Sequence, residues 1–173
     1  YYTVPDNKEP IIAIAKDKEA TGSQVTVYYK HKPMTKELKA TIAGIAGIYL
    51  KSVTSMMLND RLKEISEKPN APFMSAYSYD ANFIVSKTMD AFTTMAVSKE
   101  GETQKALKAL LQETERVNRF GFTESEYERA KANLLSMIES MYKEREKQKN
   151  NSYVEEYVSH FTDGGSICGI ETD

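Results

Sequence analysis

The sequence predicts an α+β domain in which a small, mostly antiparallel sheet carries helices on one face. Short segments rich in β-branched and aromatic residues lie in the first part of the chain and have strand character. Apolar residues recur at helical spacing over one long segment between these strands and over most of the C-terminal part. Few strands, joined in hairpins, with helices gathered together, favour one sheet and one helical layer in the order β-β-α-β-β-α-α-α.

Length and composition limit the classes of protein that the chain can belong to. Its 173 residues, 40% hydrophobic and 28% charged, suit one packed domain, and we expect residues 1–173 to form a single domain. The net charge of −2 argues against a nucleic-acid partner. No apolar run approaches the roughly 20 residues of a membrane span. The chain opens on Tyr1 without an initiator methionine or a signal peptide, so we expect it to be a piece of a longer protein.

Two strand candidates open the fold. Residues 11–17 (IIAIAKD) form a short apolar run, and turn residues follow at 20–23. Residues 24–31 (QVTVYYKH) alternate, with Val25, Val27 and Tyr29 on one face. The two segments are predicted to form a hairpin.

A long helix is predicted next, from a Thr35 N-cap to the neighbourhood of Pro69, which ends it. Its apolar stripe consists of Leu38, Ile42, Ile45, Tyr49, Val53 and Met56. Gly44 and Gly47 lie inside this stripe. A GxxG loop that clamps RNA is exposed and usually basic, so we favour close packing of this helix against the sheet.

Strand candidates at 73–79 and 87–98 follow, and Glu100 and Gly101 turn the chain into a helix over 107–117. Gly121 is placed to end that helix. Thr123 and Glu126 then spell a capping box. The helix that they open should turn one apolar face inward, formed by Tyr127, Ala130, Leu134, Met137, Ile138 and Met141.

A last short helix is predicted from a second capping box that begins at Ser152, and Gly164 is placed to end it. Its apolar residues on one side are Val154, Tyr157, Val158 and Phe161.

Residue types that carry chemistry are scarce and scattered. A metal site needs several ligands, and His31 has no histidine or cysteine near it in sequence. His160 follows Glu156 by four residues, but further ligands are missing, so a solvated helix end is the default. Cys168 has no base nearby and no second cysteine. Without a P-loop, G-x-G-x-x-G or G-x-S-x-G pattern, the residues predict no catalytic group, metal ligand or cofactor in this chain.

Three segments carry a family resemblance over nearly the whole chain. Residues 56–65 (MMLNDRLKEI), 120–131 (FGFTESEYERAK) and 161–171 (FTDGGSICGIE) resemble, in order and spacing, segments of the insulinase/pitrilysin (M16) zinc metallopeptidases. The resemblance implies the LuxS/MPP-like metallohydrolase fold. It also implies a parent chain whose homologous domains form two halves around a chamber that encloses peptide substrates.

The zinc of that family is held by an H-x-x-E-H motif, which this sequence lacks. The resemblance therefore implies a non-catalytic second domain, with zinc in the preceding catalytic domain of the parent. That domain, the remaining halves of the parent and a peptide substrate are the expected partners. Large bacterial relatives are often exported, which implies a periplasmic or cell-envelope location for the parent.

Family domains that assist catalysis carry an arginine and a tyrosine that contact substrate. At the matching positions this sequence has Ser66 and a phenylalanine near the tyrosine, Phe73, and neither can supply those donors. Arg61 is retained. It is our candidate for a substrate-chamber residue, although a structural ion pair at a helix end is the more ordinary role.

The sequence thus predicts a wall and docking domain of a zinc metalloendopeptidase that has no activity by itself. The alternative is a domain of an inactive M16 homologue that serves as a scaffold or interaction partner. A third reading, a free-standing helical binding module, predicts no exposed apolar face, whereas a domain taken from a chamber should show one.

Overall fold

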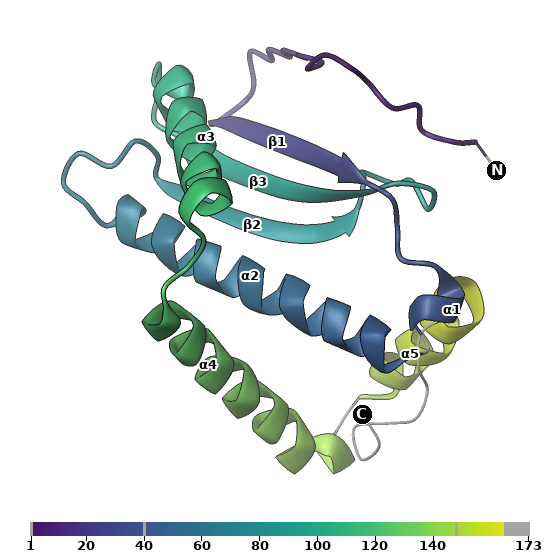
Figure 1. The fold of residues 1–173 in the computed structure, drawn as a ribbon. Coiled ribbons are helices and arrows are strands. Elements are labelled where there is room, and N and C mark those ends of the chain that lie inside the picture. The colour runs from purple at the N-terminus through teal and green to yellow at the C-terminus, as the bar shows by residue number, and fades with distance from the viewer. Residues whose placement is uncertain (1, 40, 148, 165–173) are drawn as a thin grey trace. The chain divides into compact units, whose positions relative to one another are not determined.

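The computed structural model describes residues 2–39, 41–147 and 149–164, and within them it confirms the α+β class (Figure 1). In chain order the elements are β1 (Ser23–His31), α1 (Lys36–Lys39), α2 (Ile42–Ser66), β2 (Ser75–Asn82), β3 (Asp90–Ser98), α3 (Thr103–Phe120), α4 (Glu124–Lys143), the 3-10 turn η1 (Arg145–Lys147) and α5 (Asn150–Asp163). The described residues fall into two compact units. Unit 1 comprises those of Tyr1–Pro33 and Thr54–Phe122, and unit 2 those of Met34–Val53 and Thr123–Asp173.

The sheet of unit 1 has three antiparallel strands in the order β1-β3-β2. The central strand β3 pairs with both neighbours along its whole length. Its register places Val25, Ala96 and Ala76 side by side, and Tyr29, Phe92 and Asp80 four rows further on. Since side chains alternate between the faces of a strand, both rows lie on the same face.

That face packs against α3 and the C-terminal part of α2 and forms the core of unit 1. The fully buried cluster is Leu58, Leu62, Phe73, Ala96, Ala106 and Leu110. Around it pack half-buried apolar side chains such as Val25, Phe92 and Phe122. Burying an aliphatic or aromatic side chain of this size contributes about 1.5–3 kcal/mol to folding, so this cluster is the main stabilising element of unit 1.

A side chain of α2 is hydrogen bonded to the backbone of strand β2. Asn59 Oδ1 accepts from the Ser78 backbone N–H at 2.6 Å, and Asn59 Nδ2 donates to the Ser78 carbonyl at 3.0 Å. The Ser78 hydroxyl donates to the same amide oxygen at 3.1 Å. The amide therefore binds both backbone groups of one strand residue and fixes α2 on the sheet.

Unit 2 is helical. The Tyr49 and Tyr127 hydroxyls are 3.0 Å apart and join the first half of α2 to α4. This hydrogen bond raises the pKa of Tyr49 above its ordinary value. The predicted capping box is confirmed, because Thr123 Oγ1 accepts from the Glu126 backbone N–H while the Glu126 side chain accepts from the Thr123 N–H. Gly164 ends α5 in the left-handed conformation, as expected.

The predicted strand at 11–17 is wrong. These residues form no strand, and the side chains of Ile11, Ile12 and Ile14 are about four-fifths exposed. A strand requires a neighbour for its backbone groups, and β1 pairs with β3 alone among the described residues. The other strands form close to their predicted positions, and β2 extends three residues further, to Asn82.

The predicted helix boundaries are wrong in two places. The helix expected from Thr35 is divided into α1 and α2, and Thr41 Oγ1 accepts from the Gly44 backbone N–H at the start of α2. The second capping box is not formed, because α5 begins at Asn150 and its N-cap, Lys149, makes no side-chain cap hydrogen bond. The end of α3 agrees with the prediction, since Gly121 follows it with a φ of 66°.

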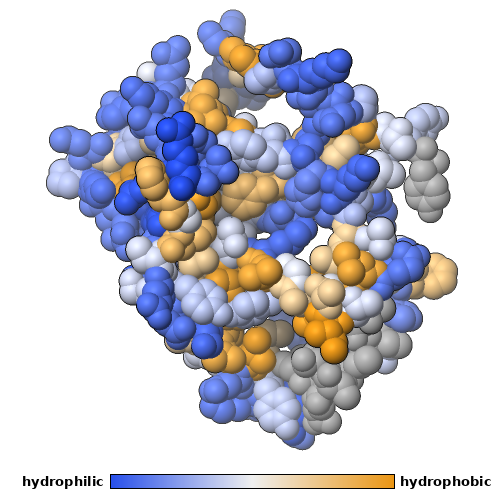
Figure 2. Space-filling view, in the orientation of Figure 1, coloured by the Kyte–Doolittle hydropathy of each residue, from blue (hydrophilic) through white to orange (hydrophobic). Residues whose placement is uncertain are grey.

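The inward apolar face predicted for α4 is only partly buried. Ala130 is fully buried, but Met137, Ile138 and Met141 are 46–55% exposed. Apolar side chains reach the surface among polar ones on the face drawn in Figure 2. In this chain, apolar periodicity thus identifies the helix but not what covers it.

Gly44 is required by a close backbone approach, and its neighbour is not the predicted one. A Cβ at this position would overlap the backbone carbonyl of Leu38 in α1. The glycine therefore permits the tight junction between α1 and α2, whereas the sequence placed it against the sheet.

We predict that Gly44→Ala destabilises unit 2 by about 1–3 kcal/mol, because the overlap with a backbone atom cannot be relieved by side-chain rotation. This outweighs the roughly 1 kcal/mol that alanine gains over glycine in a helix. Chemical denaturation followed by circular dichroism measures the change.

Gly22→Ala is the matched control, since a Cβ there meets nothing within 4 Å. Equal stability of the two variants would contradict the packing role of Gly44.

Candidate functional site

Arg61, the candidate chamber residue, lies in α2 and is mostly buried. Its Nη1 donates to Glu113 Oε1 of α3 at 3.2 Å, and its Nη2 donates to the Gly121 carbonyl at 3.1 Å. The guanidinium also lies over the Phe122 ring, 4.7 Å from its centroid. Arg61 therefore joins α2 to α3 and to the segment that follows α3.

The partner carboxylate is buried too. The Glu113 side chain is 8% exposed, and its second oxygen lies 3.7 Å from Nη1 of Arg116. A buried carboxylate needs such partners, because desolvation without them costs several kcal/mol. These contacts form a structural ion pair, which is the more ordinary of the two roles considered for Arg61. A contact between Arg61 and a substrate stays a prediction.

We predict that Arg61→Met destabilises unit 1 by about 3–5 kcal/mol, because it leaves Glu113 with a weaker set of partners in a buried place. Thermal and urea unfolding measure the loss.

Arg119→Ala is the control for charge, since its pair with Glu115 is exposed and should contribute less than about 1 kcal/mol. A loss in Arg61→Met as small as in the control would contradict the structural role.

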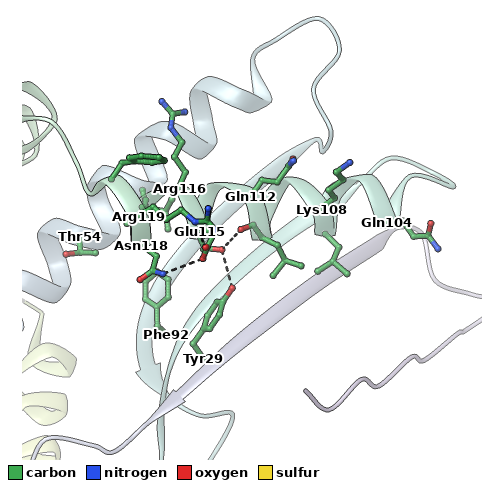
Figure 3. A pocket seen from close by; sticks show the side chains of 16 residues that line it. Tyr29, Thr54, Phe92, Gln104, Lys108, Gln112, Glu115, Arg116, Asn118 and Arg119 are labelled. Atoms are coloured by element: carbon green, nitrogen blue, oxygen red, sulfur yellow. Dashed lines mark hydrogen bonds and ion pairs between the residues drawn. The ribbon is translucent and has the colours of Figure 1, made fainter. Parts of the chain in front are cut away.

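A pocket in unit 1 lies beside α3 and has a volume of about 1310 Å³ (Figure 3). Tyr29 of β1, Thr54 and Leu58 of α2 and Phe92 of β3 line it, and residues of α3 form the rest of its lining. The Tyr29 hydroxyl lies 3.2 Å from Thr114 Oγ1. The pocket offers an apolar surface with a few polar groups, which suits binding more than reaction chemistry.

Polar side chains at this pocket are already hydrogen bonded to one another. Arg119 Nε donates to Glu115 Oε1 at 2.6 Å, and Asn118 Nδ2 donates to Glu115 Oε2 at 3.4 Å. The hydrogen bond from Arg119, with that from Asn118, holds the pKa of the Glu115 carboxyl below its ordinary value. Glu115 is therefore charged at neutral pH and is unsuited to act as a general acid there.

The positions that matched the family's substrate-contacting arginine and tyrosine are used for structure. The Ser66 hydroxyl donates to the Lys63 carbonyl at 2.7 Å within α2. Phe73 is fully buried in the core. Neither side chain presents a donor to a bound peptide.

The structure brings together one group of residues that could hold a metal ion and that sequence spacing did not indicate. One ligand atom from each of His31, Asp80 and Asp90 lies within 4.8 Å of the others. They belong to three different strands, so only the strand register could have revealed them. Among the described residues this is the one such group, and neither Glu156 nor His160 belongs to it.

This group does not fit the zinc site of the resemblance, which requires two histidines and a glutamate. It contains one histidine, and no glutamate is among its members. Cys168 lies outside the described residues. No reaction step is therefore assigned to a metal in this chain.

A scan of family models decides the affiliation. The model described as "Peptidase M16 inactive domain" matches residues 1–134. The chain belongs to the peptidase M16 family. The expected affiliation with its non-catalytic domains is confirmed.

Individual relatives agree with this assignment. A "Zinc protease PQQL-like" from Arabidopsis thaliana is 29% identical over 170 residues, which are 98% of this chain and 14% of that protein. The crystal structure of the periplasmic protease PqqL from Escherichia coli superposes with a TM-score of 0.74 at 15% identity, over 90% of this chain and 17% of that one.

The structure of the first half of PqqL gives the same TM-score and identity, and the match covers 32% of it. The fold is thus that of an M16 domain, and the chain spans only a small part of the length of these relatives. None of the described helices combines the length and apolar character that a bilayer crossing needs.

Proposed function

We propose that this chain is a non-catalytic wall and docking domain of a zinc metalloendopeptidase. In this proposal the zinc and the groups that cleave the peptide are held by a preceding domain of the parent chain. Membership of the inactive-domain family supports the proposal, and so do the protease names of the relatives. The zinc named for the Arabidopsis relative supports zinc in the parent.

The observation that carries the proposal is an exposed apolar stripe on α5. Its side chains are 41–86% exposed, with Phe161 the most exposed, and they are Tyr153, Val154, Tyr157, Val158 and Phe161. Their spacing places them along one face of a helix. Such a face is unfavourable in water and is typical of a surface that another part of the protein covers.

The same stripe weighs against a free-standing helical module, for which no exposed apolar face is expected. Residues of α4 add to the exposed apolar surface of unit 2, including Leu135, Met137 and Met141. We infer that the catalytic domain and the other halves of the parent are the partners that cover these helices.

The proposed role toward substrate is to enclose it. An enclosed site excludes bulk water and confines an extended peptide near the metal. β1 is an outer strand of the three-stranded sheet, and an outer strand can pair with an extended peptide through backbone hydrogen bonds. The similarity to PqqL, a periplasmic protease, supports a periplasmic location for the parent.

The proposal predicts that this chain alone does not hydrolyse peptides, because its described residues lack the two-histidine zinc set. The longer chain should hydrolyse fluorogenic peptides of a size that fits an enclosed chamber, and a chelator should abolish that activity. Turnover is measured for both chains with and without the chelator.

Chelator-sensitive turnover by this chain alone would contradict the proposal. A longer chain that is folded but inactive, and that lacks the H-x-x-E-H motif, would favour the scaffold alternative.

A second prediction concerns the stripe on α5. The double substitution Tyr157→Ser and Phe161→Ser should reduce binding of an apolar fluorescent dye to the isolated chain by about half or more, because it removes the two most exposed side chains of the stripe. In the longer chain the same change should lower the melting temperature by several degrees, roughly as a loss of 1–2 kcal/mol would.

Glu155→Ser is the matched control, since Glu155 is an exposed polar residue of the same helix. An unchanged melting temperature of the longer chain would mean that nothing covers the stripe.

A further inference from the structure

The group formed by His31, Asp80 and Asp90 is built by the register of the sheet. His31 is the last residue of β1 and Asp90 is the first residue of β3, and the two are direct partners across the strands. Asp90 is also the partner of Asn82 in β2, and Asp80 lies two residues before Asn82. Because side chains alternate along a strand, all three potential ligands lie on the same face at the same end of the sheet.

The hydrogen bonds of the His31 ring point to a cation between His31 and Asp80. Nδ1 lies 3.0 Å from the Lys32 carbonyl, and Nε2 lies 2.9 Å from Asp80 Oδ2. Both of these oxygens are acceptors, whereas a neutral imidazole has only one N–H. If Nδ1 donates to the carbonyl, the Nε2 lone pair faces a carboxylate oxygen, and either a proton or a metal ion must separate them.

A metal ion suits this arrangement by its donors, its charge and its access. A metal-bound histidine usually donates its other ring N–H to a backbone carbonyl or a carboxylate, and here that acceptor is the Lys32 carbonyl. Two carboxylates and an imidazole are donors that a divalent cation can take. Donors about 2.1 Å from a tetrahedral Zn²⁺ lie about 3.4 Å apart. His31 Nε2 and Asp80 Oδ2, which are 2.9 Å apart at hydrogen-bond distance, would separate by about 0.5 Å to admit the ion, and all three ligand atoms already lie within 4.8 Å of one another.

The donor types select the ion. Imidazole binds zinc well, whereas calcium and magnesium prefer oxygen ligands alone. The His31 side chain is 34% exposed and that of Asp80 is 12% exposed, so an ion can enter and water can complete its coordination.

We propose that His31, Asp80 and Asp90 bind one Zn²⁺ ion, which links the ends of all three strands of the sheet. The site is formed entirely by this chain and does not depend on the proposed function. It departs from the expectation, drawn from sequence spacing, that the chain holds no metal. The role that we assign to the ion is to hold the three strands together at this end of the sheet.

The test is calorimetric titration of Zn²⁺ into the metal-free chain near neutral pH. The reference protein is the Cys168→Ser variant, because this substitution removes the thiol as a zinc ligand. We expect one equivalent to bind at up to about 0.1 mM Zn²⁺, and the melting temperature to rise with zinc. Asp90→Asn, which keeps the shape of the side chain, should weaken binding roughly 100-fold, at the upper end of the effect of changes to groups behind a ligand.

His31→Gln should abolish binding, and His160→Gln, which removes the other histidine, should leave it unchanged. Circular dichroism verifies that each variant is folded. If His31→Gln is not folded, Asp90→Asn alone tests the proposal. No binding to the folded reference protein would mean that a proton alone lies between His31 and Asp80, and would overturn the proposal. Binding that survives Asp90→Asn, binding lost in His160→Gln, or tighter binding of Mg²⁺ or Ca²⁺ would also overturn it.

Discussion

The pairing of β3 with both of its neighbours is the constraint on which unit 1 depends. Each row of side chains across the sheet passes through this strand, so its register decides which residues of β1 and β2 share a face. One face then receives α3 and the C-terminal part of α2, and Ala96 lies in the core that they form. A shift of β3 by one residue would turn this set of side chains to the opposite face.

Local signals in the sequence predicted most of the elements. Thr123 and Glu126 are three residues apart, so their reciprocal hydrogen bonds could be inferred from the chain. Gly121 could be inferred in the same way, because the residue after a helix often needs a positive φ. The strand at 11–17 was predicted wrongly, because a strand depends on a neighbour that local sequence does not specify.

The candidate site was less predictable, because its contacts join residues that are distant in sequence. Arg61 was identified, but its partner Glu113 is 52 residues away and has no local signature. The group of His31, Asp80 and Asp90 depends on the pairing of three strands. Sequence spacing reveals metal ligands on one helix or in one loop, and it fails where the sheet assembles them.

The amide of Asn59 has a consequence for how this domain meets extended chains. Asn59 binds both the backbone N–H and the carbonyl of Ser78. These are the groups of Ser78 with which a fourth strand next to β2 would have to pair. The Asn59 side chain therefore blocks the addition of a strand next to β2. This protects the β2 edge of the sheet from self-association. Any polypeptide that lengthens the sheet is thereby directed to the far border, along β1.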